Sequence, residues 1–381
     1  MTVGIICEYN PLHLGHAAQI QKIREHFGAE TAIVCAMSGN FVQRGAPAVF
    51  SKDLRAKAAV LAGADLVLEI PITRALSSAE GFAAGGVTIL SPLCDCLCFG
   101  AETADRDSLL ATAKALLSED FPSLLRQALE SGCSFPAARS QALAQMGVDT
   151  EVLSHPNNIL GVEYCKAILA SGSAMDIFPI FRPGSYHAAE PDPRAPSATA
   201  LRGRLLSGGD WASFVPPALR AVFEGAPLHT IAPGERAMLA RLRTMTDAEF
   251  EALPYGSEGL WRKFMHASRR EATLENILAA TKSKRYTRSR LDRMAMCAFL
   301  GITGEDMVQV PPYTRILAFS QRGRALLGKA KAHNCYINAG EAFPHPYWEL
   351  DARATDLYAL FAANAPDPPG MEERYRVFYL K

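Results

Sequence analysis

The stretch VGIICEYNPLHLGHAAQIQKI, residues 3–23, decides the fold of the N-terminal part of the chain. Its first five residues, 3–7, are a short apolar run, typical of a buried parallel strand. His13 and His16 follow with Gly15 between them, and apolar residues then recur at helical spacing. A strand that turns directly into a helix is the first step of a βαβ unit. The two imidazoles therefore lie where such a unit presents a helix N-terminus.

The alternation of strand and helix continues for about the next 200 residues. Apolar runs predict further strands at residues 31–37, 65–71, 96–102 and 174–181. Helical patterns lie between them, at residues 51–64, 76–90 and 105–173, the last as a helical insertion. A Pro-rich loop over 186–196 then leads to a helix that opens near Ser197. We expect an α/β fold: a Rossmann-like parallel sheet with helices on both faces, spanning residues 1–210.

The remaining chain, residues 211–381, differs in character. It is mainly helical from 215 to 300, with mixed strand and helix patterns over 314–338 and a strand or loose tail at the end. We therefore expect a second, mainly α region after residue 210.

Composition sets limits on the class of protein. The 381 residues include 39 Lys+Arg and 39 Asp+Glu, so the overall charge does not attract nucleic acid and any such binding needs a local basic patch. Nine scattered cysteines do not form a disulfide framework. Cys94, Cys96 and Cys98 alternate and would share one face of a strand, where buried packing is favoured over a zinc site. With no leader or membrane-spanning run, we expect a reduced cytoplasmic protein.

The two histidines have four candidate roles: packing, proton transfer, metal binding and phosphate binding. A metal site needs three or four ligands, and no further His or Cys cluster lies nearby. Phosphate binding fits the position best, because a helix N-terminus beyond a parallel strand offers unpaired N–H groups and a positive dipole end. Gly15 would let the backbone approach a phosphate, and the imidazoles would donate to its oxygens.

A strand followed by P-x-H-x-G-H and a helix resembles the nucleotidyltransferase superfamily with the HIGH motif. The second motif of that superfamily is a Ser/Thr-rich turn with a basic residue. The stretch SATALRGRL, residues 197–205, matches it through Ser197, Thr199 and Arg202. Ser197 suits a helix N-cap near phosphates, and Arg202 adds a forked cation.

Longer stretches narrow the resemblance. EYNPLHLGH, MSGNFVQRGAPAVFSKDLRAKAAVLAGADLVLEIP, FGAE, PNNILGVEY and KRYTRSRLDRM together closely resemble the bacterial tRNA(Met) cytidine acetate ligase family, from residue 3 to about 330. Leu12 departs from the Phe expected in many members. The resemblance implies ATP and acetate as substrates and elongator tRNA(Met) as the partner. It implies acetyladenylate formation with release of pyrophosphate, then acetyl transfer to the N4 amine of the wobble cytidine. We expect Mg²⁺ to accompany ATP and no metal ion to be tightly bound by the protein, since no carboxylate cluster marks a site.

The resemblance also implies site residues. His13 and His16 would contact the phosphates, with His16 at the α-phosphate, while Ser197, Thr199 and Arg202 would hold the β- and γ-phosphates. The ATP-binding residues implied are Ile6, Cys7, Glu8, Tyr9, Asn10, Pro11, Leu12, His13, Leu14, Gly15, His16, Ala17, Ala18, Gln19, Gly100, Asn157 (or its neighbour Asn158) and Arg182. For acetate, the available groups are Ser38, Gly39, Asn40, Gln43, Arg44 and Lys52, and the sequence does not rank them.

A local basic segment lies in the second region. Residues 282–293, KSKRYTRSRLDR, hold six cations and a single acid, Asp292, with Tyr286 interleaved. Such a segment favours phosphate backbones, and Tyr286 could stack on an unpaired base, although a solvated helix face would show the same pattern. The tRNA-binding residues expected are Lys282, Lys284, Arg285, Tyr286, Arg288, Arg290 and Arg293.

Two other functions compete with tRNA acetylation. A small-molecule adenylyltransferase of the same superfamily would share both phosphate motifs, but such enzymes lack the roughly 170 additional residues and the basic segment found here. A non-enzymatic RNA-binding protein on a relic fold would not need both motifs intact.

Overall fold

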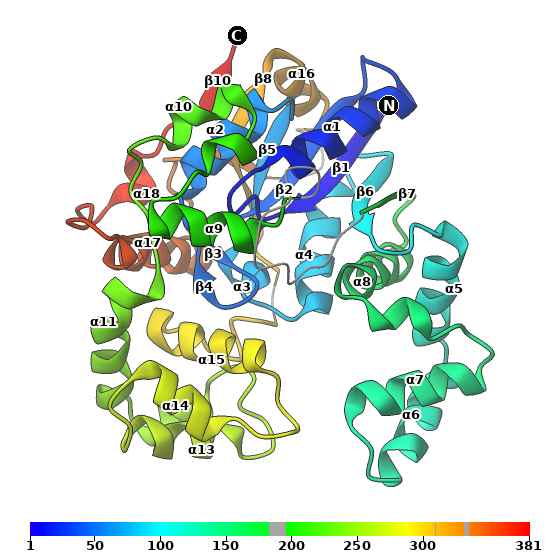
Figure 1. Ribbon diagram of the computed structural model, residues 1–381, viewed down its shortest axis with the longest axis vertical. Coiled ribbons are helices and arrows are strands. Elements are labelled where there is room, and N and C mark those ends of the chain that lie inside the picture. Colours follow the sequence, from blue (N-terminus) through cyan, green and yellow to red (C-terminus); the bar gives the residue numbers. More distant parts are fainter. Residues whose placement is uncertain (183–195, 309, 331–334) are drawn as a thin grey trace.

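An eight-stranded, mostly parallel sheet forms the centre of the structure, a computed structural model that describes residues 1–182, 196–308, 310–330 and 335–381. The strand order across the sheet is β10-β8-β5-β2-β1-β6-β7, with β9 paired to β8 (Figure 1). The strands are β1 (Thr2–Cys7), β2 (Ala32–Ser38), β5 (Leu66–Ile70), β6 (Cys96–Ala101), β7 (Asp176–Phe181), β8 (Thr314–Ser320), β9 (Tyr336–Asn338) and β10 (Phe378–Leu380). A separate hairpin pairs β3 (Phe41–Val42) with β4 (Ala46–Pro47).

The five strands expected from the first half of the sequence are confirmed and run parallel to one another. The chain builds β1, β2 and β5 in one direction, then returns to place β6 and β7 on the other side of β1. The strand order therefore reverses between β1 and β6. In open α/β sheets such a reversal leaves a crevice at the carboxyl ends of the strands, where ligands bind.

The predicted boundary at residue 210 does not separate the sheet from the rest of the chain. β8 pairs antiparallel with β5, and both β9 and β10 pair with β8, so three strands from beyond residue 211 belong to the same sheet. Without them the backbone edge of β5 would be left unpaired. The expected mainly helical second region is present, but its last segments return to complete the sheet.

Helices cover both faces of the sheet. In the first half they are α1 (Leu14–Phe27), α2 (Lys52–Leu61), α3 (Ile72–Ala75), α4 (Ala79–Leu90), α5 (Arg106–Leu116), α6 (Phe121–Glu130), α7 (Phe135–Gln145), α8 (Pro156–Ser171) and α9 (Ala198–Ser207), with a 3₁₀ turn at Glu151–Ser154. Buried residues of α1 and α2 pack on one face, and those of α4, α5 and α8 pack on the other. The Pro-rich loop expected before α9 lies outside the described residues except at Pro196.

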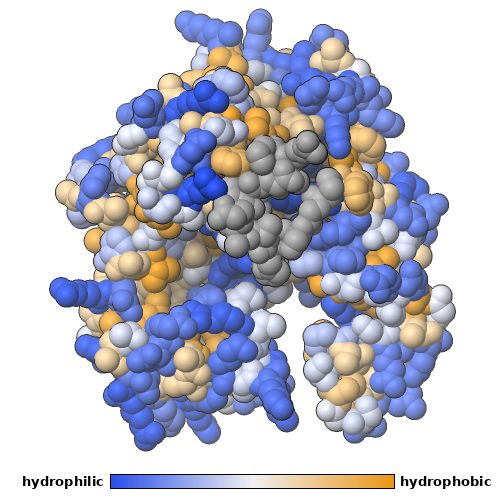
Figure 2. Space-filling model, in the orientation of Figure 1, coloured by the Kyte–Doolittle hydropathy of each residue, from blue (hydrophilic) through white to orange (hydrophobic). Residues whose placement is uncertain are grey.

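The second half of the chain is mainly helical, and some of its helices form a lobe beside the sheet. Its helices are α10 (Pro217–Phe223), α11 (Ile231–Thr244), α12 (Asp247–Glu251), α13 (Leu260–Ser268), α14 (Leu274–Thr281), α15 (Arg288–Leu300), α16 (Gln321–Ala330), α17 (Pro346–Tyr358) and α18 (Met371–Arg374), with 3₁₀ turns at Ala212–Phe214 and Ala359–Phe361. Helices α11 to α15 and α17 share one apolar cluster. Figure 2 shows an open notch between the lobe that holds α13 to α15 and the end of the insertion formed by α6 and α7.

The cysteines of β6 behave as predicted, with one correction. Cys96 and Cys98 are buried in the cluster on one face of the sheet, which confirms packing as their role. Cys94 precedes β6 and packs into the cluster on the opposite face, so the three do not share a face. Within the described residues, no helix is both long and apolar enough to cross a membrane.

Candidate functional site

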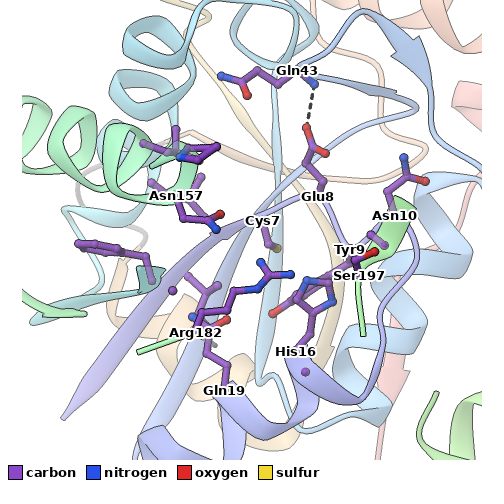
Figure 3. Close-up of a pocket in the computed structure, with 18 of the residues that line it drawn as sticks. Cys7, Glu8, Tyr9, Asn10, His16, Gln19, Gln43, Asn157, Arg182 and Ser197 are labelled. Atoms are coloured by element: carbon purple, nitrogen blue, oxygen red, sulfur yellow. Dashed lines mark hydrogen bonds between the residues drawn. The ribbon is translucent and has the colours of Figure 1, made fainter. Parts of the chain in front are cut away.

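A cavity of about 500 Å³ lies at the carboxyl ends of β1, β6 and β7. Its walls come from the loop after β1, the first turns of α1, the β3–β4 hairpin, and the N-terminal ends of α8 and α9. The two motifs, separated by almost two hundred residues, therefore meet in one place (Figure 3). The volume falls in the range typical of small-molecule sites.

His13 and His16 stack at the start of α1. Their ring centroids are 3.7 Å apart, and the backbone N–H of His13 donates to Nδ1 of His16 at 3.3 Å. Because that nitrogen accepts, a neutral His16 ring carries its proton on Nε2 and can donate from there. Both ring nitrogens of His13 are buried and lack a partner among the described residues, although the residue lines the cavity. Buried polar atoms without partners are costly, so they point to a ligand.

Burial keeps both imidazoles uncharged. It lowers the pKa of His13 to about 3, with the nearby cations Arg182 and Arg202 adding to the effect. Burial and the neighbouring His13 ring hold the pKa of His16 well below its usual range. Neutral imidazoles can donate hydrogen bonds to an anionic ligand. Because they are uncharged, no ion pair within the protein has to break before the ligand binds. Gly15 makes this packing possible, since a Cβ there would lie 3.1 Å from the His13 ring.

The second motif begins α9 on the same wall. Ser197 is the N-cap, and its Oγ accepts from the backbone N–H of Ala200 at 3.1 Å. The Arg202 guanidinium donates to the carbonyl oxygen of Asn10 at 2.7 Å and to Oγ1 of Thr199 at 3.0 Å. Arg202 therefore joins this motif to the loop that precedes the histidines. A helix N-terminus and a forked cation are features that favour an anionic ligand on this wall.

Three further residues implied by the resemblance also line the cavity, with the Arg182 side chain beside His16 (Figure 3). Gly100 is the penultimate residue of β6, Arg182 follows β7, and both line the cavity. Asn157 also lines it and donates to Oε1 of Glu102 at 2.7 Å. Asn158 is fully buried, and its Oδ1 accepts from a backbone N–H beyond β6 instead. The structure thus distinguishes the two neighbours and places Asn157 at the cavity.

Most of the stretch from Ile6 to Gln19 reaches the cavity, but not all of it. Pro11, Leu12, Leu14 and Ala17 are absent from its walls. The sequence reasoning missed Lys22, which lies one helical turn beyond Gln19, as well as an apolar wall. Helical spacing from His16 through Gln19 could have identified Lys22, whereas the apolar wall had no signal. That wall includes Phe82, Phe99, Ile159, Leu160, Tyr164 and Phe181.

The groups considered for acetate fall into two sets. Gln43 and Arg44 line the cavity, and Ser38, Gly39, Asn40 and Lys52 do not. Lys52 is buried, and its ammonium contacts Glu69 at 2.9 Å and Glu372 at 2.7 Å. These two buried ion pairs connect distant segments of the fold. They leave the Lys52 ammonium unavailable to a ligand in the cavity.

The basic segment lies beyond the hairpin, at the start of α15. Lys282, Lys284 and Arg285 are exposed. Arg288 is exposed but ion-paired, to Glu275 at 2.7 Å and Asp292 at 2.8 Å.

The other three residues expected to bind tRNA, Tyr286, Arg290 and Arg293, have contacts within the protein. Arg290 stacks on the Tyr286 ring at 4.8 Å and donates to the carbonyl of Tyr255, while the Tyr286 hydroxyl donates to Glu258. Arg293 lies over the Tyr255 ring at 5.1 Å. The exposed cations are thus concentrated in the first half of the segment.

Within the described ranges, no cluster of three or more His, Cys, Asp or Glu side chains could hold a metal ion. Glu8 is the one carboxylate on the described walls of the cavity. The residues present therefore do not form a protein site for Mg²⁺, which commonly binds through substrate phosphates and water instead.

Comparisons with known proteins identify the family of the chain. The model of the HIGH Nucleotidyl Transferase family matches residues 1–371. The tRNA(Met) cytidine acetate ligase of Alkaliphilus metalliredigens is 35% identical, with 95% of this chain and 94% of the relative covered. That of Bacillus subtilis is also 35% identical, covering 94% and 92%.

Solved structures are similar over the whole chain. Apo TmcAL from Thermotoga maritima superposes with a TM-score of 0.90 at 28% identity, covering 99% of each chain. The same protein bound with alpha-thio ATP gives 0.87 at 28% identity and covers all of both chains. The chain therefore belongs to the HIGH nucleotidyltransferase family and, within it, to the tRNA(Met) cytidine acetate ligases.

Proposed function

We propose that this protein uses ATP to activate acetate as acetyladenylate, releasing pyrophosphate, and then transfers the acetyl group to N4 of the wobble cytidine of elongator tRNA(Met). The observation that carries the proposal is the meeting of His13 and His16 with Ser197, Thr199 and Arg202 in one cavity. The relative that binds an ATP analogue has the same fold over its full length, which supports ATP as the ligand here.

The first step needs positioning and charge stabilisation more than covalent chemistry. Acetate attacks the α-phosphorus, a new P–O bond forms, and the bond to the pyrophosphate oxygen breaks. His16 would donate from Nε2 to the α-phosphate as charge builds, and His13 would donate beside it. Ser197, Thr199 and Arg202 would hold the β- and γ-phosphates that leave.

The adenosine would lie along the other side of the cavity. Gly100 and Asn157 line that side, near the apolar wall that includes Phe99, and Arg182 lies beside His16. The absence of a side chain at Gly100 would let the nucleoside approach β6 closely. The described residues of the cavity do not form a protein site for Mg²⁺.

The tRNA would bind the lobe formed by α13 to α15. Lys282, Lys284 and Arg285 are exposed and favour a phosphate backbone. The notch in Figure 2 lies between this lobe and the helical insertion and would give room for a single-stranded anticodon loop. The cytoplasm is the compartment in which we place this reaction.

The direct test uses the whole protein with radiolabelled acetate, ATP and bulk tRNA, followed by digestion of the RNA to nucleosides. Label in N4-acetylcytidine is the expected result. Transfer of AMP to a small acceptor without RNA labelling would instead identify a small-molecule adenylyltransferase. Retention of tRNA without any turnover would identify an RNA-binding protein.

A further inference from the structure

Glu8 is an acidic residue on the wall of the cavity where the anionic ATP is proposed to bind. The cations Lys22, Arg44, Arg182 and Arg202 line the same cavity, and Glu8 is its one carboxylate among the residues that the structure describes. A carboxylate beside a polyphosphate raises the energy of the complex, because like charges repel at close range. A phosphate is therefore a poor ligand for the Glu8 carboxylate, which is suited to accept from a hydrogen-bond donor instead.

The carboxylate is held in a defined place. Its Oε1 accepts from the backbone N–H of Gln43 at 2.8 Å, and its Oε2 has no hydrogen-bond partner in the described part of the chain. The backbone carbonyl of Glu8 accepts from Arg55 at 2.6 Å, and Arg55 is fully buried. Glu8 is thus fixed at its backbone and at one oxygen, which leaves the second oxygen available to a ligand.

Glu8 also points toward a particular side of the cavity. Figure 3 shows its side chain directed at Gln43 and away from Arg182 and His16. The carbonyl oxygen of Gln43 accepts from Arg293 on α15, the helix that directly follows the exposed basic residues. An acceptor base delivered from that lobe would approach on the side of Glu8, across from the phosphate-binding wall.

The chemistry of the acceptor fits a carboxylate. The N4 amine of cytidine is a hydrogen-bond donor that Glu and Asp accept, and its lone pair is delocalised into the ring, which makes it a weak nucleophile. Attack on an acyl carbon leaves positive charge on the nitrogen until a proton departs. A positioned carboxylate can take that proton as a general base.

We infer that Glu8 is a catalytic residue of acetyl transfer, which accepts the N4–H of the target cytidine and removes one proton as the amine attacks; this rests on the proposed function. The N4 lone pair forms a C–N bond to the acetyl carbon, and the carbonyl electrons move to oxygen. Glu8 takes one N4 proton. Collapse of the intermediate breaks the bond to the phosphate oxygen and releases AMP, and Glu8 then returns its proton to solvent.

The test separates the two half-reactions with the Glu8→Gln variant. The amide oxygen of Gln can still accept from the Gln43 N–H, so the loop is expected to keep its shape, which thermal melting checks. Acetate-dependent exchange of pyrophosphate into ATP reports the first step. Single-turnover transfer of labelled acetyl from preformed acetyladenylate to tRNA reports the second.

We expect transfer to slow at least about a hundredfold more than exchange in Glu8→Gln, because only transfer would use the carboxylate as a base, whereas exchange reports any contact of Glu8 with ATP. The matched control is Glu25→Gln, since Glu25 is exposed on α1 and pairs with Gln21. Unchanged transfer in Glu8→Gln overturns the inference. Loss of exchange also overturns it, and would indicate that Glu8 serves ATP or its metal ion. If the unmodified protein itself does not acetylate tRNA, the proposed function fails instead.

Discussion

Arg293 on α15 donates a hydrogen bond from Nη1 to the carbonyl oxygen of Gln43, at 3.3 Å, and so joins the helical lobe to the β3–β4 hairpin that lines the cavity. The two surfaces are in close contact. Gly45, at the turn of the hairpin with φ of +78°, would place a Cβ only 2.4 Å from the backbone nitrogen of Arg293. This seam adds to the apolar contacts of Phe41, Ile72 and Leu76 with the lobe, and it is the part of the contact that borders the cavity.

Gly45→Ala should disturb the seam. The left-handed backbone alone costs about 1 kcal/mol for a residue with a Cβ, and the clash with α15 adds to it. We expect a lower free energy of unfolding, measured by chemical denaturation, and a higher KM for tRNA. The control is Gly172→Ala, because Gly172 has φ of +65° with no atom within 4 Å of the added Cβ. Equal effects of the two substitutions would contradict a role for the seam.

His16→Ala should slow acetate-dependent pyrophosphate release at least about a hundredfold, because it removes a donor aimed at charge that develops in the transition state. Binding of tRNA, measured by filter retention, should stay near normal, since the basic segment lies on the separate helical lobe. If tRNA binding collapses while pyrophosphate release persists, the division of roles between cavity and lobe is wrong.

His13 should make stability depend on pH. Its pKa is about 3 in the folded protein against 6.5 for the unfolded chain. Between these values only the unfolded state binds the proton, so stability present above pH 6.5 is lost as the pH falls and the loss is complete near pH 3. The expected slope is about 1.4 kcal/mol per pH unit.

His13→Gln should remove that part of the slope. Chemical denaturation at pH 7, 6 and 5 provides the measurement, and the difference between variant and unmodified protein isolates His13 from other titrating groups. Identical slopes would show that His13 is not held neutral by its surroundings.

Lys284→Ala with Arg285→Ala should weaken tRNA binding and lower the salt dependence of log K by about 1.5, since two exposed phosphate contacts are lost. Arg288→Ala is the matched comparison. Its guanidinium is already paired with Glu275 and Asp292, so its removal should change the salt dependence less. Filter binding over a series of salt concentrations measures both, and a larger effect from Arg288 would relocate the tRNA contact.

Arg315→Met should destabilise the fold by about 3 kcal/mol or more, because it leaves buried carboxylates without a partner. Arg315 contacts Glu69 at 3.3 Å, Asp351 at 3.1 Å and Glu372 at 3.2 Å. Burial raises the pKa of Glu69, whereas Lys52 and Arg315 outweigh burial at Glu372 and lower its pKa.

The comparison for Arg315 is Arg106→Met. That substitution breaks an exposed pair and should change the free energy of unfolding little. Equal losses in the two variants, measured by denaturant unfolding, would contradict a stabilising role for the buried network.

The sequence alone determined the parallel half of the sheet and the position of the two motifs at the start of helices. Apolar runs and helical spacing are local signals that can be read within a short stretch of sequence. The stretch 3–23 contains both, since the apolar strand at 3–7 is followed by His13, His16 and a helical pattern. The motif around Ser197 has the local signature of a helix N-cap, which the structure confirms.

Only the tertiary structure decided how distant segments meet. No local pattern shows that β8 pairs with β5 across about 250 residues. The sequence also does not show that Asn157 and not Asn158 faces the cavity, or that Lys52 is ion-paired with Glu69 and Glu372. The sequence shows that Glu8 is acidic. It does not show that Glu8 is the one carboxylate on the described walls of a cavity that four cations also line. Strand pairing and side-chain direction depend on contacts between residues far apart in the chain, and spacing within one stretch contains no information about them.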